Sequence, residues 1–265
     1  MSEGDAADRP PPSRIPAAWL LLHEVLFGLL FVTVLVSLAV AGTPDPASMF
    51  FFGSFLLLQC LLVLFFFQRP TPTRWRLRLL LYPLLINVVY LRIPQVVAAL
   101  GLDLQDSTLL QIDRLLIGGD LSVRLEPFVS PHRTELLSGA YLFYIFVPAQ
   151  GPYLAFPHLY AVPLVGGALY RFMAAVVRLG GIRVDVFPSL HCAVPAFILA
   201  FDFIHKRRRF WICLAPCLLL LFSTLYLRYH YFIDLLGGLF LAAIALALAE
   251  RWRLGGRLAK SDLAT

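Results

Sequence analysis

The sequence predicts an all-α membrane protein, a polytopic bundle of about six transmembrane helices with short interfacial helices. Of the 265 residues, 60% are hydrophobic and 14% are charged. An ordinary soluble domain is about half apolar and about a quarter charged. The 22 Lys and Arg residues cluster in short polar breaks between apolar runs. This placement indicates membrane topology rather than nucleic-acid binding.

The N-terminal part of the chain predicts a tail followed by three membrane spans. Residues 1–16 are polar and Pro-rich, as in a disordered tail. The apolar run 17–41 is too long for a signal peptide and lacks a small-residue cleavage site, so we expect it to remain as a helix. Further spans are expected over 49–67 and over 79–100, on either side of an arginine-rich break at 68–78.

The middle of the chain is more polar. Residues 101–133 contain five acidic residues at irregular spacing, namely Asp103, Asp106, Asp113, Asp120 and Glu126. The calcium-loop pattern is absent, and we expect a solvated loop that caps the bundle. Two apolar stretches follow, 134–148 and 165–179. The charge pattern requires that both cross the membrane or that neither does, and the sequence leaves both alternatives open.

The last third predicts three more spans, over 192–204, 210–229 and 231–249. Cytoplasmic loops are enriched in Lys and Arg, so the basic run 205–209 and the tail after Glu250 are predicted to lie in the cytoplasm. We therefore expect one integral-membrane domain over residues 17–253, followed by a cytoplasmic tail over residues 254–265.

Three ionisable residues stand out in this apolar third: His191, His230 and Asp234. His230 and Asp234 are four residues apart, so on a helix the carboxylate can reach the imidazole. The predicted topology brings His191 to the same, non-cytoplasmic face (periplasmic, extracellular or lumenal). Ionisable groups in membrane segments are costly and are candidates for function. Polar groups that reach the interface from a helix end are the alternative for His230 and Asp234, and a helix-cap polar residue is the alternative for His191.

This set of residues is sufficient for phosphoryl transfer. One neutral imidazole attacks phosphorus and forms a phosphohistidine. A carboxylate behind that imidazole fixes its tautomer, and a second imidazole protonates the leaving oxygen. Ser189 precedes His191 at a predicted helix start, where free N–H groups favour a phosphate, although an N-cap role is equally open. The four cysteines show no CxxC or zinc spacing, and we expect no metal and no cofactor.

Two motifs carry a resemblance to a known family. Residues 187–191 read Phe-Pro-Ser-Leu-His, and residues 223–234 read Ser-Thr-Leu-Tyr-Leu-Arg-Tyr-His-Tyr-Phe-Ile-Asp. They resemble the second and third motifs of the type-2 phosphatidic acid phosphatase superfamily, and most closely its inositol phosphorylceramide synthase branch. The resemblance implies that His230 is the nucleophile, Asp234 its partner and His191 the acid and base.

The chain departs from the phosphatase pattern at the phosphate-binding cations. The first phosphatase motif, Lys-x6-Arg-Pro, has its nearest counterpart in residues 144–152, which lack both cations. Thr224 stands where a phosphatase has Arg. Arg228 and Arg183 are candidate substitutes that would bind substrate, with interfacial anchoring as the alternative for each. Because a phosphodiester carries a single negative charge and needs fewer cations, these departures favour transfer of a head group.

The resemblance therefore implies a metal-independent lipid phosphotransferase. Its donor would be phosphatidylinositol, its acceptor a ceramide-like lipid alcohol and its by-product diacylglycerol, so its partners would be membrane lipids. Two alternatives stay open. The first is a lipid phosphate phosphatase that acts on phosphatidate or a polyprenyl diphosphate, with water as the acceptor. The second is a non-catalytic pseudoenzyme, which the missing first motif favours.

Overall fold

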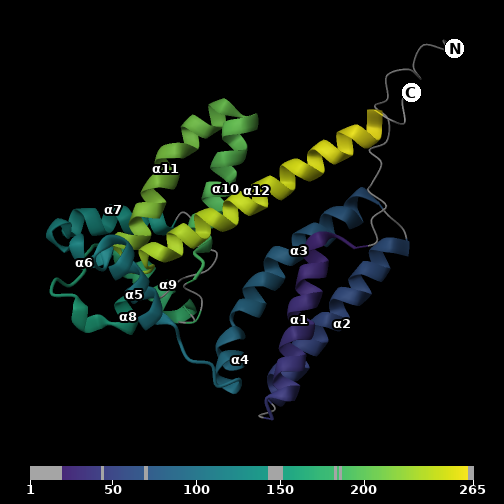
Figure 1. Cartoon of the computed structure of the whole chain (residues 1–265), viewed down its shortest axis with the longest axis horizontal. Helices are drawn as coiled ribbons and strands as arrows, with labels where there is room; N and C mark the ends of the chain where they lie inside the picture. The colour runs from purple at the N-terminus through teal and green to yellow at the C-terminus, as the bar shows by residue number, and fades with distance from the viewer. Residues whose placement is uncertain are drawn as a thin grey trace. The chain divides into compact units, whose positions relative to one another are not determined.

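The computed structural model describes residues 20–42, 45–68, 71–142, 152–181, 184 and 187–261, the last ten of these as backbone only. Throughout these ranges the regular structure is helical, with no strand, which confirms the all-α prediction. The chain divides into two compact units, residues 1–102 and 103–265 (Figure 1). The predicted tail over residues 1–16 lies outside the described residues, and the predicted domain boundaries stay predictions.

The first unit consists of four helices, of which α1, α2 and α3 lie side by side (Figure 1). Their bounds are α1 Leu22–Val40, α2 Pro46–Gln68, α3 Pro72–Tyr90 and α4 Ile93–Ala99. The hydroxyl of Thr71 caps α3 by accepting the N–H of Arg74. The predicted third span is thus two helices, bent by 44° at the break between α3 and α4. Pro94 explains the break, because it lacks the N–H that would continue the hydrogen-bond ladder of α3.

A buried polar cluster holds the first unit together beside its aromatic core. Arg78 of α3 forms an ion pair with Glu24 of α1, and both side chains are almost completely buried. Gln59 of α2 donates its Nε2–H to the backbone oxygen of Glu24 at 2.5 Å. One residue of the predicted arginine-rich break, Arg78, therefore points into the unit. A charge buried in this way needs a partner within the protein.

The second unit carries the C-terminal motifs. Its helices are α5 Asp106–Ile117, α6 Leu121–Arg124, η1 Glu126–Phe128, α7 Pro131–Leu142, α8 Pro152–Ala155, η2 Pro157–Leu159, α9 Ala168–Gly180, α10 Leu190–His205, α11 Arg207–Tyr226 and α12 Phe232–Ser261. Helices α10 and α11 form a hairpin that turns at Lys206, and α12 packs along α10 (Figure 1). Helices α7, α9 and α11 share a core that includes Leu137, Met173 and Leu220.

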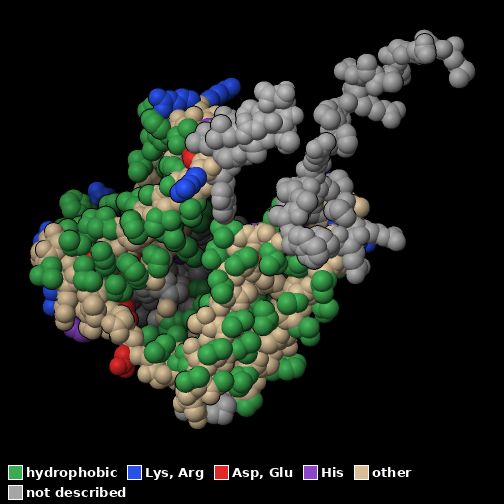
Figure 2. Space-filling view, turned by 45° about the vertical axis from the view of Figure 1, so that its right-hand side comes forward, with side chains coloured by type: hydrophobic (Ala, Val, Ile, Leu, Met, Phe, Trp, Pro, Cys, Tyr) green, Lys and Arg blue, Asp and Glu red, His purple; other side chains and the backbone are tan. Residues whose placement is uncertain are grey.

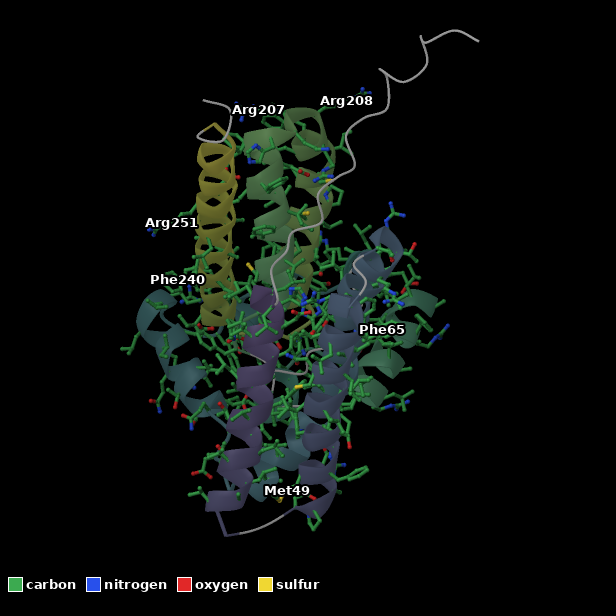
Figure 3. The ribbon with its side chains drawn as sticks, turned by 90° about the vertical axis from the view of Figure 1, so that its right-hand side faces the viewer. Met49, Phe65, Arg207, Arg208, Phe240 and Arg251 are labelled. Atoms are coloured by element: carbon green, nitrogen blue, oxygen red, sulfur yellow. The ribbon has the colours of Figure 1, made fainter. Side chains whose placement is uncertain are left out.

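Several helices are suited to a bilayer. Among the described residues, α1, α2, α11 and α12 are long and apolar enough to cross a membrane, and there are five such segments if the bent pair of α3 and α4 is counted as one span. Helix α10 is apolar but has only 16 residues. The predicted multi-pass architecture is therefore confirmed. Hydrophobic side chains cover much of the visible surface (Figure 2). Phe240 of α12, labelled in Figure 3, is 69% exposed. Such exposure is expected of a surface in contact with lipid.

Basic residues gather at one end of the hairpin, where Figure 3 labels Arg207 and Arg208. At this end Asp202 of α10 pairs with Arg209 of α11. The imidazole Nε2 of His205 lies 2.5 Å from the Glu250 carboxylate of α12. These pairs connect the three C-terminal helices at the end of α10 opposite to His191.

The N-terminal ends of α10 and α12 approach each other closely at Gly238. A Cβ atom at this position would lie 2.5 Å from the backbone oxygen of Ser189 and 2.8 Å from Cβ of Cys192. Only a residue without a side chain allows α10 to lie against α12 at this distance. The Gly237-Gly238 pair therefore sets how close the two motifs come.

We predict that Gly238→Ala destabilises the protein by about 1–3 kcal/mol, because the new methyl group forces two packed backbones apart. Thermal unfolding in detergent, followed by intrinsic fluorescence, measures the effect. The matched control is Gly53→Ala in α2, where a Cβ atom meets nothing within 4 Å. Equal unfolding midpoints for the Gly238→Ala variant and the parent protein would contradict the close approach.

Candidate active site

The three residues predicted to be catalytic lie together in the second unit. His191 is the second residue of α10, His230 lies in the turn between α11 and α12, and Asp234 is the third residue of α12. The Nε2 atom of His230 is 3.2 Å from Nδ1 of His191, and its Nδ1 atom is 3.3 Å from Oδ2 of Asp234. All three side chains are at most 2% exposed. The hydrogen bonds thus form a continuous chain from the carboxylate to the second imidazole.

Ser189 also contacts this chain. Its Oγ lies 3.2 Å from Nε2 of His230, and its backbone N–H donates to the backbone oxygen of Asp234 at 3.1 Å. Although Ser189 occupies the N-cap position of α10, its side chain makes no capping hydrogen bond. The hydroxyl of Ser189 therefore faces His230 and does not cap α10, and its role in binding phosphate stays a prediction.

The network assigns the proton of neutral His230 to Nδ1. Oδ2 of Asp234 accepts the N–H of Tyr231 at 2.8 Å, which holds the carboxylate beside the imidazole. An acceptor next to Nδ1 favours the tautomer that carries its proton there. The unprotonated Nε2 then faces Ser189 and His191. A neutral imidazole in this tautomer can act as a nucleophile through Nε2.

The turn that presents His230 depends on Arg228. This residue has a φ of +66°, in the left-handed region that residues other than glycine rarely adopt. The turn allows the N–H groups of Tyr229 and His230 to donate to the backbone oxygen of Thr224 at 2.9 and 3.3 Å, which terminates α11. Thr224 thus contributes its backbone oxygen to the turn, and its hydroxyl donates to the oxygen of Leu221 at 2.8 Å.

The Arg228 side chain is buried inside the unit rather than anchored at its surface. Its Nη2 donates to Glu126 at 3.2 Å and to the backbone oxygen of Val162 at 2.7 Å. Its guanidinium carbon lies 4.2 Å from the ring centroid of Tyr160. Among the described residues, Nε and Nη1 of Arg228 have no hydrogen-bond partner. Two nitrogen atoms of this buried cation are therefore available to donate to another group.

The acidic stretch is not the solvated loop that the sequence predicted. Asp113 of α5 is fully buried and accepts the N–H groups of Phe232 and Ile233 at 2.7 and 2.8 Å. Asp106 accepts the hydroxyl of Tyr231 at 2.9 Å. The free N–H groups at the start of α12 need acceptors, and this requirement draws the carboxylates inward. The acidic residues therefore position the segment that carries His230 and Asp234.

Burial changes the titration of several groups around this segment. It raises the pKa of the Asp113 carboxyl, and the two backbone hydrogen bonds oppose this effect. Burial also raises the pKa of the phenols of Tyr160 and Tyr231. Both phenols therefore remain neutral donors at pH 7, Tyr160 to Asp120 and Tyr231 to Asp106.

Aromatic packing fixes the plane of the His191 ring. Tyr141 of α7 stacks on His191 with ring centroids 4.9 Å apart and an interplanar angle of 21°. Tyr229 packs against Tyr141 in the same core, with the two ring centroids 4.9 Å apart. Nothing in the sequence pattern identified Tyr141, because it lies 50 positions before His191.

The segment that carries these residues also matches a known family. Residues 135–248 match the family model of the PAP2 superfamily. The match covers 114 of the 265 residues and includes His191, His230 and Asp234. It supports the type-2 phosphatidic acid phosphatase superfamily and, with it, phosphatase or phosphotransferase chemistry, without distinguishing the inositol phosphorylceramide synthase branch. Neither the curated proteins nor the solved structures contain a match to the chain.

Some predicted features of this PAP2-like unit cannot be placed. Arg183 lies outside the described residues, as do positions 144–151 of the 144–152 counterpart to the first phosphatase motif. Among the described residues, no three His, Cys, Asp or Glu side chains are arranged to hold a metal ion. The described part of the site consists of two imidazoles, carboxylates, hydroxyl groups and Arg228.

We predict that Asp113→Asn costs about 1–3 kcal/mol of stability, because the amide can accept one of the two N–H groups but leaves the other without an acceptor. The unfolding midpoint of the purified protein measures this loss. The matched control is Asp103→Asn, at an exposed position just before α5. If both variants unfold at the temperature of the parent protein, Asp113 does not hold the start of α12.

Proposed function

We propose that this protein transfers a phospho-head group between membrane lipids, without a metal ion, through a phosphohistidine intermediate. The observation that carries the proposal is the chain of contacts from Asp234 through His230 to His191. By resemblance to the synthase branch, the donor is phosphatidylinositol and the acceptor is a ceramide-like lipid alcohol. The products are the inositol-phosphorylated lipid and diacylglycerol.

In the first step Nε2 of His230 attacks the phosphorus atom of the donor. The bond from phosphorus to the diacylglycerol oxygen breaks, and protonated His191 gives its proton to that oxygen. Asp234 stabilises the positive charge that develops on His230. In the second step the lipid alcohol loses its proton to His191 and attacks phosphorus. The bond from phosphorus to Nε2 of His230 breaks, and both imidazoles return to their starting states.

The substrate phosphate has to enter between the two imidazoles, which contact each other directly at 3.2 Å. Ser189 and the N-terminus of α10 offer hydrogen-bond donors to the phosphate oxygens at this point. We assign Arg228 a substrate-binding role through its Nε and Nη1 atoms. Arg183 keeps the same proposed role on the basis of the sequence alone.

The charges around the site favour a diester over a monoester. Arg228 already forms an ion pair with Glu126, so its positive charge is largely balanced. Thr224, at the position where a phosphatase has Arg, directs its hydroxyl to the backbone of α11. A phosphate monoester dianion therefore finds little net positive charge among the described residues, whereas a diester needs less. This balance supports transfer over the alternative of phosphate hydrolysis.

We predict that the purified, reconstituted protein moves labelled phosphoinositol from phosphatidylinositol to ceramide and keeps this activity in EDTA. His230→Ala abolishes the transfer because it removes the nucleophile. His191→Ala lowers the rate roughly 100- to 10,000-fold, since it removes the general acid and base. The matched control, His158→Ala in η2, changes an exposed histidine outside the site and keeps full activity.

Three outcomes would each remove part of this proposal. Transfer by the His230→Ala variant would exclude His230 as the nucleophile. Loss of activity in EDTA would exclude the metal-independent mechanism. Release of free phosphate from phosphatidate, with no transfer to ceramide, would replace the transferase by the phosphatase.

We also propose that the site faces the non-cytoplasmic side of the membrane. His191 is at the opposite end of the 16-residue helix α10 from the basic hairpin end, a rise of about 24 Å. Lys and Arg residues concentrate on cytoplasmic loops.

We predict that a cysteine at position 208 (Arg208→Cys) reacts with a membrane-impermeant maleimide only after the cells are opened. A cysteine at the exposed position 103 (Asp103→Cys) reacts in intact cells. The native chain, with its four cysteines, sets the background. The reverse pattern would place the histidines on the cytoplasmic side.

A further inference from the structure

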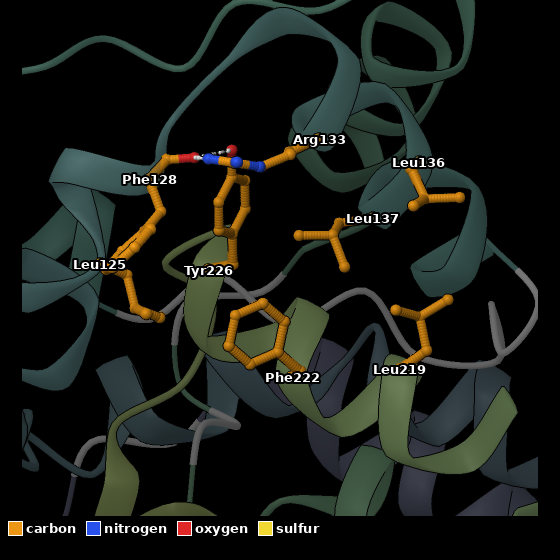
Figure 4. A pocket seen from close by; sticks show the side chains of 8 residues that line it. All are labelled: Leu125, Phe128, Arg133, Leu136, Leu137, Leu219, Phe222 and Tyr226. Carbon is orange, nitrogen blue, oxygen red and sulfur yellow. Dashed lines mark hydrogen bonds between the residues drawn. The ribbon is translucent and has the colours of Figure 1, made fainter. Parts of the chain in front are cut away.

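The second unit contains an apolar pocket of about 450 Å³ that the proposed chemistry does not use (Figure 4). Helices α7 and α11 supply most of its walls, with residues near η1 completing them. The side chains that line it are Leu125, Phe128, Arg133, Leu136, Leu137, Leu219, Phe222 and Tyr226. Seven of these eight residues are aliphatic or aromatic, and Arg133 is the only charged one.

The pocket is placed where a lipid chain can reach it. Leu219 and Phe222 belong to α11, one of the helices suited to cross the membrane. Leu136 is 61% exposed and Phe222 is 44% exposed, so the pocket opens to the outside of the unit. Where α11 crosses a bilayer, the outside of the unit is in contact with hydrocarbon. Each methylene group that enters an apolar pocket from water is worth about 0.8 kcal/mol, and a lipid chain from the bilayer gains close packing contacts instead.

A positive charge lies at the edge of this pocket. Nη1 of Arg133 donates to the backbone oxygen of Phe128 at 3.0 Å, and no ion pair among the described residues involves Arg133. Arg133 lies in the first turn of α7, which contains no acidic residue. Ser130 already accepts the backbone N–H groups of Arg133 and Thr134, so it is the positive end of the α7 dipole that adds to the potential of the Arg133 side chain. An anion beside Arg133 would therefore be stabilised from two sources.

This edge is separate from the histidines. Tyr141, which stacks on His191, lies eight residues after Arg133 on the same helix, a rise of about 12 Å. A phosphate bound to Arg133 is thus not the phosphate that reacts between the imidazoles. The pocket and the active site are nevertheless linked through packed side chains. Leu137 lines the pocket one turn before Tyr141 on α7, and both residues belong to one hydrophobic core.

We propose that the pocket binds an accessory anionic phospholipid, with one acyl chain among the apolar residues and its phosphate on Arg133. A volume of about 450 Å³ falls within the range of small-ligand sites, roughly 300–1,000 Å³. The bound lipid supports α7 from the outside and so helps to hold Tyr141 against His191. This site is independent of the reaction proposed above, because the lipid is bound and not consumed.

A tryptophan placed in the pocket tests this proposal. The four native tryptophans are replaced by phenylalanine, and Phe222→Trp introduces a single reporter of similar shape. The protein is reconstituted in phosphatidylcholine with increasing amounts of phosphatidylglycerol that carries brominated acyl chains, which quench tryptophan on contact. We expect saturable quenching at low mole fractions of phosphatidylglycerol. Adding Arg133→Gln raises the mole fraction for half-quenching about fivefold, as expected for the loss of one basic contact.

Two controls separate a bound lipid from the surrounding bilayer. Leu248→Trp places the reporter on the exposed face of α12, where quenching should follow the bulk fraction of brominated lipid. Arg178→Gln removes an exposed arginine of α9 and should leave the Phe222→Trp curve unchanged. The proposal is overturned if brominated phosphatidylcholine and phosphatidylglycerol quench Phe222→Trp equally, or if Arg133→Gln has no effect. The result does not depend on any enzymatic activity.

Discussion

The two hydrogen bonds that Asp113 accepts from the first residues of α12 are the interaction on which the site depends. In an apolar surrounding, free N–H groups at a helix start are costly, and one carboxylate satisfies those of Phe232 and Ile233. Asp234 accepts the preceding N–H, from Tyr231. These bonds fix the residue at which α12 begins. They therefore also fix where Asp234 lies relative to His230, which sits just outside the helix.

The close packing at Gly238 fixes the position of α10 relative to the start of α12. Because no side chain intervenes, the backbone of Ser189 lies against α12 and donates to the oxygen of Asp234. The first turn of α12 thus positions Asp234 directly and Ser189 through the backbone. His191 follows two residues later at the start of α10. The start of α12 thus sets the distance of 3.2 Å between Nε2 of His230 and Nδ1 of His191. A movement of α10 or α12 alone would break this contact.

Features that depend on local sequence could be predicted, whereas features that depend on distant partners could not. Long apolar runs and the spacing of His230 and Asp234 are local, so the helices and that contact follow from the sequence. The partners of Asp113 lie 119 and 120 positions away, and a pattern of irregularly spaced acids predicts no partner at such a distance. The left-handed turn at Arg228 gave no signal for the same reason, since the turn satisfies backbone groups of α11 that the sequence does not reveal.

The carboxylates that build the site also restrict its charge. Glu126 balances Arg228, and Asp234 balances the charge that forms on His230, so the described site carries little excess positive charge. A doubly charged monoester would enter this buried site at a large desolvation cost with few cations to offset it. A singly charged diester would enter at a lower cost. The interactions that position the histidines therefore favour the substrate class that the proposed head-group transfer requires.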